Sequence, residues 1–265
     1  MRLRSLRRRI EFNHTILNLV FILFCYASRN KLTVGKGYEK NPMINRPSNK
    51  IIRFWVLGLL FTLGLVVIFT DLAEDVWFKE GFSWDAPIIL SIHQISRPWL
   101  DTAMRILTQA GETGAITVAL LASLFFFRKH NTLDAVAIII SLMGASAMNT
   151  LWKTLLHRPR PNLFLPLVIE KGFSFPSGHV TASVAVYGFL AILLWRNRHY
   201  AWAIFSASWI FIVAFSRIYL GVHYPSDTLG AMVFTSLWLT VILFIRDRYS
   251  RTSKTPFHIH FKKSL

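Results

Sequence analysis

Residues 176–195 read PSGHVTASVAVYGFLAILLW, a short polar turn followed directly by an apolar run. Pro176 suits the first turn of a helix, Ser177 can cap it, and Gly178 lets the backbone approach a ligand closely. The run Gly178–Trp195 is close to the roughly 20 apolar residues that span a bilayer. The stretch therefore predicts a transmembrane helix whose first turn opens at a membrane surface.

Other apolar segments repeat this pattern along the chain. Thr113–Phe127 is short, but the amphipathic stretch Leu100–Gly111 precedes it and extends it at the interface. We expect an all-α, polytopic membrane protein with six transmembrane helices in one domain over residues 51–246. The five further spans are Ile51–Thr70, Thr113–Phe127, Leu133–Trp152, Tyr200–Ser216 and Thr228–Ile245.

Composition supports a membrane protein. The chain has 265 residues, of which 53% are hydrophobic and 16% charged, whereas soluble domains are about 25% charged. The net charge is +17, and the basic residues lie between the apolar runs and in both tails. This distribution favours anionic lipid headgroups over nucleic acid as partners. The single cysteine, Cys25, excludes an internal disulfide and a Cys/His zinc cluster.

Charge placement predicts the orientation. With the start of the first span inside, the basic connections 128–129 and 196–198 and the basic residues after Ile245 fall on the inner side, and the acidic stretch 71–112 falls outside. Five basic residues on the outer side oppose this rule and require a local reason. They are Lys153, Arg158, Arg160, Lys171 and Arg217.

The two ends of the chain lie outside the predicted domain. Residues 1–50 form a basic extension with a short apolar segment, Thr15–Ala27. A cleaved signal peptide would leave the start of the first span outside, so we favour an interfacial helix, or an upstream extension of the reading frame with Met43 as the true start. Residues 247–265 are expected to be a basic cytoplasmic tail.

Three short strings lie at the predicted outer ends of spans and suit one phosphate site. They are Lys153-x6-Arg160-Pro161, Pro176-Ser177-Gly178-His179 and Ser216-Arg217-x5-His223-x3-Asp227. Each has an ordinary alternative: cations that reach lipid headgroups, a plain helix cap with an interfacial histidine, or a His–Asp pair that ties a loop. Their shared position on one membrane face favours a common site.

The third string has the spacing of an activated histidine. Asp227 follows His223 by four residues across a proline turn, so its carboxylate can accept the Nδ1 proton and leave a lone pair on Nε2. In the second string, the free N–H groups at the start of a helix favour an anion beside His179. Together the strings predict attack on a phosphate ester.

These strings resemble, at every motif position, the three motifs of the type 2 phosphatidic acid phosphatase family. The resemblance implies that His223 is the nucleophile, that Asp227 orients it, and that His179 protonates the leaving oxygen. It also implies that the phosphate is held by Lys153, Arg160, Arg217, Ser177 and Gly178, and that no metal or other cofactor is needed.

The resemblance implies a lipid phosphatase of the cell membrane, with its active site outside the cytoplasm and a lipid phosphate as substrate. We expect undecaprenyl diphosphate in a bacterial membrane, because its diphosphate faces outward and Arg158 and Lys171 could meet the second phosphate. Phosphatidylglycerophosphate and phosphatidate present the same chemistry. A lipid phosphotransferase and a non-enzymatic transporter or channel are further alternatives; the oligomeric state is left open.

Overall fold

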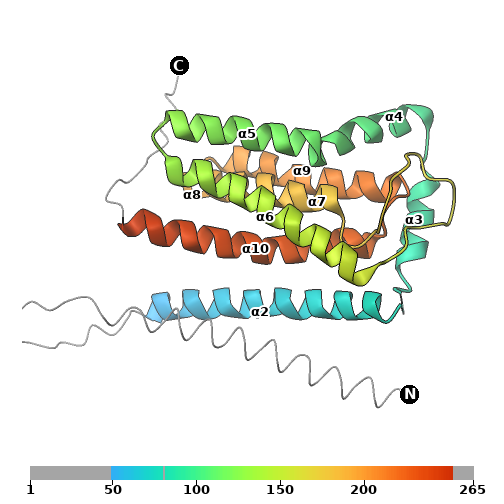
Figure 1. The fold of residues 1–265 in the computed structure, drawn as a ribbon, viewed down its shortest axis with the longest axis horizontal. Coiled ribbons are helices and arrows are strands. Elements are labelled where there is room, and N and C mark those ends of the chain that lie inside the picture. Colours follow the sequence, from blue (N-terminus) through green and yellow to red (C-terminus); the bar gives the residue numbers. More distant parts are fainter. Residues whose placement is uncertain (1–48, 80, 253–265) are drawn as a thin grey trace, which may run out of the picture. The chain divides into compact units, whose positions relative to one another are not determined.

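A computed structural model describes residues 49–79 and 81–252 (Figure 1). All regular structure within these two ranges is helical. The elements are α2 (Asn49–Trp77), α3 (Asp85–His93), α4 (Pro98–Leu107), the 3₁₀ turn η1 (Thr108–Gly111), α5 (Thr113–Arg128), α6 (Thr132–Leu156), α7 (Gly178–Ser183), the π turn η2 (Val184–Gly188), α8 (Phe189–Arg196), α9 (Tyr200–Tyr219) and α10 (Pro225–Thr252).

Five helical segments of the described part are long and apolar enough to cross a membrane. They are Pro98–Arg128, Thr132–Leu156, Gly178–Arg196, Tyr200–Tyr219 and Pro225–Ser250. They contain the last five predicted spans, and the predicted amphipathic stretch Leu100–Gly111 becomes α4 and η1 at the head of the first. The chain is therefore a multi-pass, all-helical membrane protein.

The N-terminal span stays a prediction. Contacts divide the chain into a unit of residues 1–70 and a unit of residues 71–265, and α2 runs through the boundary. Up to Thr70, this helix covers the predicted span Ile51–Thr70. The predicted N-terminal extension and most of the predicted tail lie outside the described residues, although α10 continues to Thr252.

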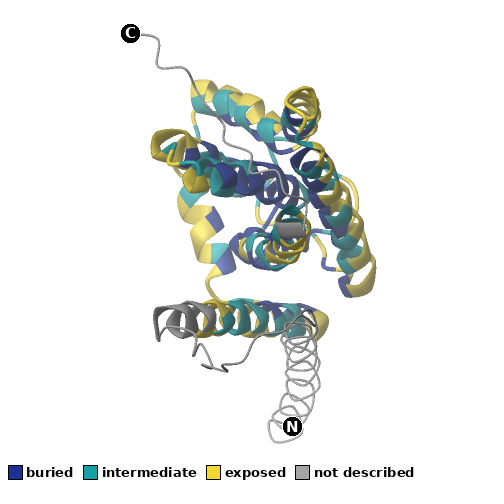
Figure 2. Ribbon diagram, turned by 90° about the vertical axis from the view of Figure 1, so that its left-hand side faces the viewer, coloured by how far each residue is buried: buried dark blue, intermediate teal, exposed yellow. Residues whose placement is uncertain are grey.

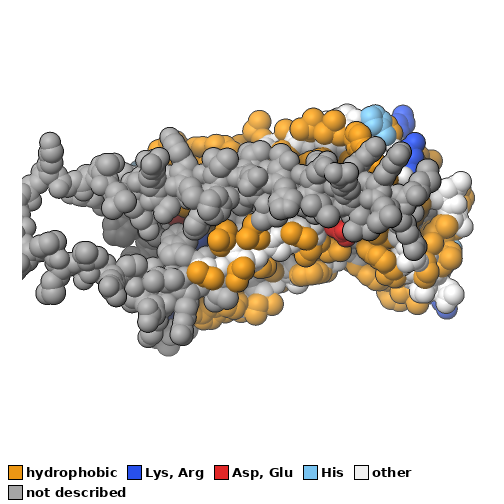
Figure 3. Space-filling model, turned by 90° about the horizontal axis from the view of Figure 1, so that it is seen from below, with side chains coloured by type: hydrophobic (Ala, Val, Ile, Leu, Met, Phe, Trp, Pro, Cys, Tyr) orange, Lys and Arg blue, Asp and Glu red, His pale blue; other side chains and the backbone are white. Residues whose placement is uncertain are grey.

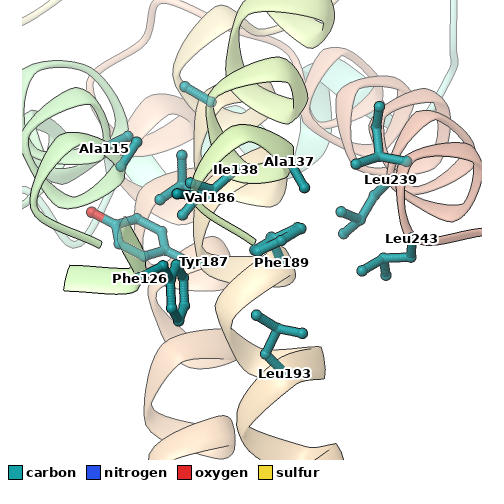
Figure 4. Close-up of a cluster of buried hydrophobic side chains, with 14 residues drawn as sticks. Ala115, Phe126, Ala137, Ile138, Val186, Tyr187, Phe189, Leu193, Leu239 and Leu243 are labelled. Atoms are coloured by element: carbon teal, nitrogen blue, oxygen red, sulfur yellow. The ribbon is translucent and has the colours of Figure 1, made fainter. Parts of the chain in front are cut away.

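The helix formed by α7, η2 and α8 lies at the centre of the hydrophobic core of the second unit. Its Val186, Tyr187, Phe189 and Leu193 pack against side chains of α5, α6 and α10 (Figure 4). Burial is concentrated here, whereas the outer faces of the surrounding helices are exposed (Figure 2). The apolar run that follows the polar turn at 176–179 thus forms the centre of this bundle.

Small side chains allow these helices to approach closely. Ala115, Ala119 and Ala137 are buried at helix contacts, as expected where lipid gives helices little hydrophobic reason to associate. Large apolar side chains face outward instead, including Leu121 of α5 and Trp202 of α9. Hydrophobic side chains predominate on the described part of the surface shown in Figure 3. These faces suit contact with lipid tails.

The π turn in the central helix is supported by its neighbours. A π turn leaves backbone carbonyls without their usual helical partners. Ser141 of α6 donates a hydrogen bond of 2.9 Å to the carbonyl of Ala185, and Ser206 of α9 donates one of 2.8 Å to that of Tyr187. Such satisfaction is needed where no water reaches the backbone. The turn is therefore tied to two adjacent helices.

The helix ends that carry the three strings meet at one end of the bundle, which we call the outer end after the orientation predicted from charge placement. There the end of α6, the connection 157–177, the start of α7, the end of α9 and the start of α10 lie together, and α3 packs against α9 and α10 (Figure 1). Helix α3 was absent from the sequence prediction, because nine residues that include a proline carry little periodic signal.

Candidate active site

A cavity of about 790 Å³ opens at the outer end. Five of the predicted site residues line it: Lys153, Arg160, Gly178, His179 and His223. The other three, Ser177, Arg217 and Asp227, are buried and contact residues of this group. All eight residues taken from the three strings are thus brought together.

His223 and Asp227 form the expected pair. Nδ1 of His223 lies 3.4 Å from Oδ2 of Asp227, which also accepts a hydrogen bond of 2.8 Å from the Tyr224 backbone. Pro225 begins α10, so the carboxylate sits in its first turn and the histidine in the turn before it. The proline turn predicted from sequence therefore sets this geometry.

The other ring nitrogen of His223 faces cations. Nε2 lies 3.3 Å from Nη1 of Arg160, and a guanidinium can only donate. We therefore assign the Nδ1 proton to the Asp227 side and the lone pair to Nε2. Burial, followed by the charges of Arg217 and Arg160, holds the pKa of His223 well below its usual range. The ring is neutral at neutral pH and Nε2 is available as a nucleophile.

His179 sits in the first turn of α7 between opposite charges. Its Nε2 lies 3.2 Å from Oε2 of Glu112 and 3.4 Å from Nη1 of Arg217. Glu112 precedes the first residue of α5 and also lines the cavity. Sequence reasoning did not single out this carboxylate, because its partner lies 67 positions away and no local pattern marks it. A proton on Nε2 of His179 would be favoured by the carboxylate of Glu112 and opposed by the guanidinium of Arg217.

Two buried donors at the site have no hydrogen-bond partner within the described part of the chain. They are Oγ of Ser177 and Nε of Arg217. The sequence predicted that Ser177 could cap the helix, and it does occupy the N-cap position, but its hydroxyl makes no capping bond. Unsatisfied buried donors are costly, so a pair of them beside a helix start favours an anionic ligand.

Backbone carbonyls hold the cations of the first string. Nζ of Lys153 donates to the carbonyl of Phe173 at 2.5 Å, and Arg160 donates to those of Lys171, Gly172 and Val222 at 3.1, 3.0 and 2.9 Å. Burial, opposed by the charge of Glu170, lowers the pKa of Arg160, which nevertheless stays a cation. Both side chains are therefore fixed toward the cavity.

Arg158 does not have the role expected from sequence. It was expected to meet a second phosphate, but it is only 8% exposed and is absent from the lining of the cavity. Nη1 donates to Oδ1 of Asp227 at 2.5 Å and to Oγ of Ser226 at 2.7 Å, and Nη2 donates to Oδ2 of Asp85 at 2.8 Å. Its bonds to two buried carboxylates leave it unable to reach a substrate.

The Arg158 network is a support for the catalytic pair. Asp85, from α3, also accepts hydrogen bonds from the backbone and hydroxyl of Ser226, at 3.0 and 2.5 Å. Asp227 therefore has one oxygen bound to Arg158 and the other turned to His223. Sequence reasoning missed Asp85, which is distant from Asp227 along the chain, and the only available signal was an outer arginine whose charge needed a local reason.

Comparisons with known proteins find relatives of this chain. Residues 134–251 match the PAP2 superfamily. Phosphatidylglycerophosphatase B of Bacillus subtilis (strain 168) is 31% identical over 193 residues, which cover 69% of this chain and 92% of the relative. Undecaprenyl-diphosphatase BcrC of the same organism is 29% identical over 154 residues, which cover 55% of this chain and 76% of the relative.

A solved structure shares the fold. The transmembrane PAP2-type phosphatidylglycerolphosphate phosphatase from Bacillus subtilis superimposes with a TM-score of 0.62 and 28% identity. The match covers 73% of this chain and 97% of that protein. The similarity thus extends beyond the three strings to the whole bundle.

Proposed function

The chain belongs to the PAP2 superfamily and is a lipid phosphatase, and we propose that it converts undecaprenyl diphosphate to undecaprenyl phosphate through a phosphohistidine on His223. The observation that carries the mechanism is the position of His223, with Nδ1 on Asp227 and Nε2 turned toward the cations of the cavity. The reaction takes place on the extracytoplasmic side of a bacterial membrane.

The first step is attack by Nε2 of His223 on the phosphorus atom. A P–N bond forms as the P–O bond to the leaving group breaks, and His179 donates its proton to the departing oxygen. Lys153, Arg160 and Arg217 neutralise the charge on the phosphate oxygens, and Ser177 and the backbone of Gly178 donate hydrogen bonds to them. The imidazolium at His223 is stabilised by Asp227.

The second step releases phosphate. His179, now neutral, takes a proton from water as the water oxygen attacks phosphorus and the P–N bond breaks. The electron pair of that bond returns to Nε2 of His223. Charge neutralisation in both steps comes from side chains of the protein, so we propose that the reaction needs no metal.

The apolar part of the cavity supports a lipid substrate. Ile116 and Leu120 of α5 and Leu142 and Met143 of α6 line the same cavity as the two histidines. Leu120 and Met143 are also exposed, so the apolar lining continues onto the outer surface of the helix pair. A lipid tail can therefore lie between α5 and α6 while its phosphate reaches His223.

The choice of lipid depends on the cations that a second phosphate would meet. Of the two expected from sequence, Arg158 is bound elsewhere, and the exposed Lys171 remains at the cavity. Phosphatidylglycerophosphate is the second candidate, favoured by the 31% identity to a phosphatidylglycerophosphatase B. Transfer of the phosphoryl group to an acceptor lipid would use the same first step.

A substrate panel tests the proposal. Purified protein in detergent with EDTA is assayed for phosphate release from undecaprenyl diphosphate, phosphatidylglycerophosphate and phosphatidate, with and without an acceptor lipid. We expect activity in EDTA and the highest kcat/KM for undecaprenyl diphosphate. A higher value for either phosphatidyl substrate, or phosphate release that requires an acceptor, would contradict this assignment.

A further inference from the structure

The cavity contains a carboxylate that binds the cations assigned to phosphate. Glu170 lies in the connection between α6 and α7 and lines the cavity beside His179 and His223. Its Oε1 accepts a hydrogen bond of 2.5 Å from Nη2 of Arg217, and its Oε2 lies 3.8 Å from Nη2 of Arg160. Two of the three cations in the phosphate site are thus joined by one side chain.

The residues after Glu170 accept further hydrogen bonds from the cation cluster. The carbonyls of Lys171 and Gly172 accept from Arg160, and that of Phe173 accepts from Lys153. We call residues 170–173 the cation-binding segment. All three cations therefore donate to oxygen atoms of this one segment.

Glu170 is charged under ordinary conditions. Burial alone would raise its pKa, but the charge and hydrogen bond of Arg217 and the charge of Arg160 bring the pKa below its usual value. Carboxylates and phosphates both accept paired hydrogen bonds from guanidinium groups. A phosphate that makes such a paired contact, through the unpartnered Nε and through Nη2 of Arg217, must therefore replace the carboxylate.

The side chain of Glu170 has room to withdraw from the cavity. Ile169 is 92% exposed, Lys171 is exposed, and the side chain of Glu170 is 28% exposed. Gly172 has φ +78°, a conformation that other residues seldom adopt, and a Cβ there would meet nothing within 4 Å. Movement of Glu170 toward solvent would therefore break no packing of the core.

We propose that Glu170 determines specificity by competing with phosphate groups for Arg217 and Arg160, so that doubly charged terminal phosphates displace it and singly charged phosphodiesters do not. A terminal phosphate carries about −1.5 to −2 charges at pH 7, and its attraction to a cation grows in proportion. The tethered carboxylate acts at millimolar or higher effective concentration. The inference rests on the proposed function, since it names what that site selects.

A phosphatase that faces a bilayer must distinguish lipids with a terminal phosphate from phosphodiester lipids. The common phospholipids are phosphodiesters and greatly outnumber a lipid with a terminal phosphate. Three cations without a competing anion would bind those headgroups as well. With Glu170 bound to Arg217 and Arg160, a phosphate that carries a single negative charge does not displace the carboxylate.

Binding of inorganic phosphate tests the competition without turnover. Isothermal titration calorimetry in detergent compares the wild type with E170Q, E170A and E170D. Loss of one charged hydrogen-bond acceptor should tighten phosphate binding on the order of 10-fold to 100-fold in E170Q and E170A, and E170D should stay near the wild type. Unchanged or weaker binding in both uncharged variants would overturn the proposal.

Inhibition by a phosphodiester tests the selectivity. Phosphate release is measured in micelles of a phosphate-free detergent with increasing phosphatidylglycerol. Half-inhibition of E170Q should need on the order of tenfold less phosphatidylglycerol than that of the wild type, by the same loss of competition. The matched control D247N removes one carboxylate at the other end of the bundle and should behave as the wild type. Equal inhibition of E170Q and the wild type would refute the selectivity.

The two proposals fail in different ways. A wild type that hydrolyses none of the lipids in the panel contradicts the proposed substrate, yet phosphate titration still reports whether Glu170 competes. A wild type that hydrolyses them with E170Q unchanged in phosphate affinity contradicts only the role of Glu170.

Discussion

Charged side chains gather at both ends of the bundle, but the two clusters are built differently. At the inner end, Arg246 donates to both oxygens of Asp134 at 2.6 and 3.0 Å and to Asp247 at 2.9 Å, and Asp247 also binds Arg196. At the outer end, three cations share Glu170 and backbone carbonyls, and buried donors of Ser177 and Arg217 lack partners in the described structure.

The difference separates a structural cluster from a functional one. The inner pairs join the start of α6 to the ends of α8 and α10 and satisfy each other, which is the usual condition for charge near a membrane. The outer cluster holds an excess of donors directed at one cavity. Such an excess is a cost to folding that a bound anion offsets. The two ends should therefore respond differently to mutation.

The largest expected contrast is between the two histidines and the inner carboxylate. H223A removes the nucleophile and H179A the proton donor, so kcat should fall by at least about 10⁴-fold in each. D247N should keep kcat within about twofold, because it alters only two partly exposed ion pairs at the end of the bundle away from the cavity. Phosphate release and trapping of an acid-labile phosphoenzyme are measured. Near-normal turnover in H223A would show that the nucleophile is misassigned.

Loss of a single cation should give an intermediate effect. A cation about 4 Å from a phosphate charge contributes at most about 4 kcal/mol at an effective dielectric constant of about 20. K153A should therefore lower kcat/KM on the order of 10²–10³-fold and keep a trace of activity.

The matching change at the inner end should affect folding instead. R246M leaves Asp134 without its main partner and should destabilise the protein on the order of 2 kcal/mol, with kcat/KM little changed in the folded fraction. Thermal unfolding and initial rates separate the two effects. If kcat/KM fell as far in R246M as in K153A, the inner cluster could not be called purely structural.

Arg158 is expected to act on the rate through Asp227. R158K keeps a cation but cannot bridge Asp85, Ser226 and Asp227 together. We expect kcat to fall about 10-fold to 100-fold in R158K, with KM little changed and a larger loss in R158M, by analogy with other supporting residues of catalytic groups. A rise in KM for diphosphates alone would instead restore the role first expected for Arg158.

Sequence alone could predict the elements whose pattern is local. The apolar runs predicted five spans that the structure contains, and the spacing of His223 and Asp227 predicted their pairing because they are only four residues apart. Partners from distant segments carried no such signal. Asp85, Glu112 and Glu170 become part of the site only when α3, α5 and the connection 157–177 meet at the outer end.

Arg158 and Arg160 show the same limit at closer range. Both are outer arginines in one proline-rich stretch. The first string marked Arg160 as a phosphate ligand, but no local pattern marked Arg158 as a partner of Asp227. Pro159 between them and the left-handed turn at His157 direct one side chain behind the catalytic pair and the other into the cavity. Charge placement indicated that Arg158 had a local role, and only packing showed that this role is to support Asp227.

The smallest expected effect is a shift in pH dependence. His223 must be neutral to attack, so activity is lost as pH falls through its pKa. Since that pKa is depressed in the folded protein, the acid limb of kcat/KM should lie below the ordinary histidine value of about 6.5. Removing a neighbouring cation raises the pKa of His223 again. In R160Q the acid limb should therefore move to higher pH, whatever the loss in rate.

The basic limb should also be present, because His179 must carry a proton, and the profile should be bell-shaped. D247N changes a charge far from His223 and should leave both limbs in place. Rates of the wild type, R160Q and D247N are measured at low substrate concentration from about pH 4 to 9, a range that includes the ordinary pKa of histidine. A flat profile would contradict the paired histidines, and an acid limb that stays in place in R160Q would show that Arg160 does not set the charge state of His223.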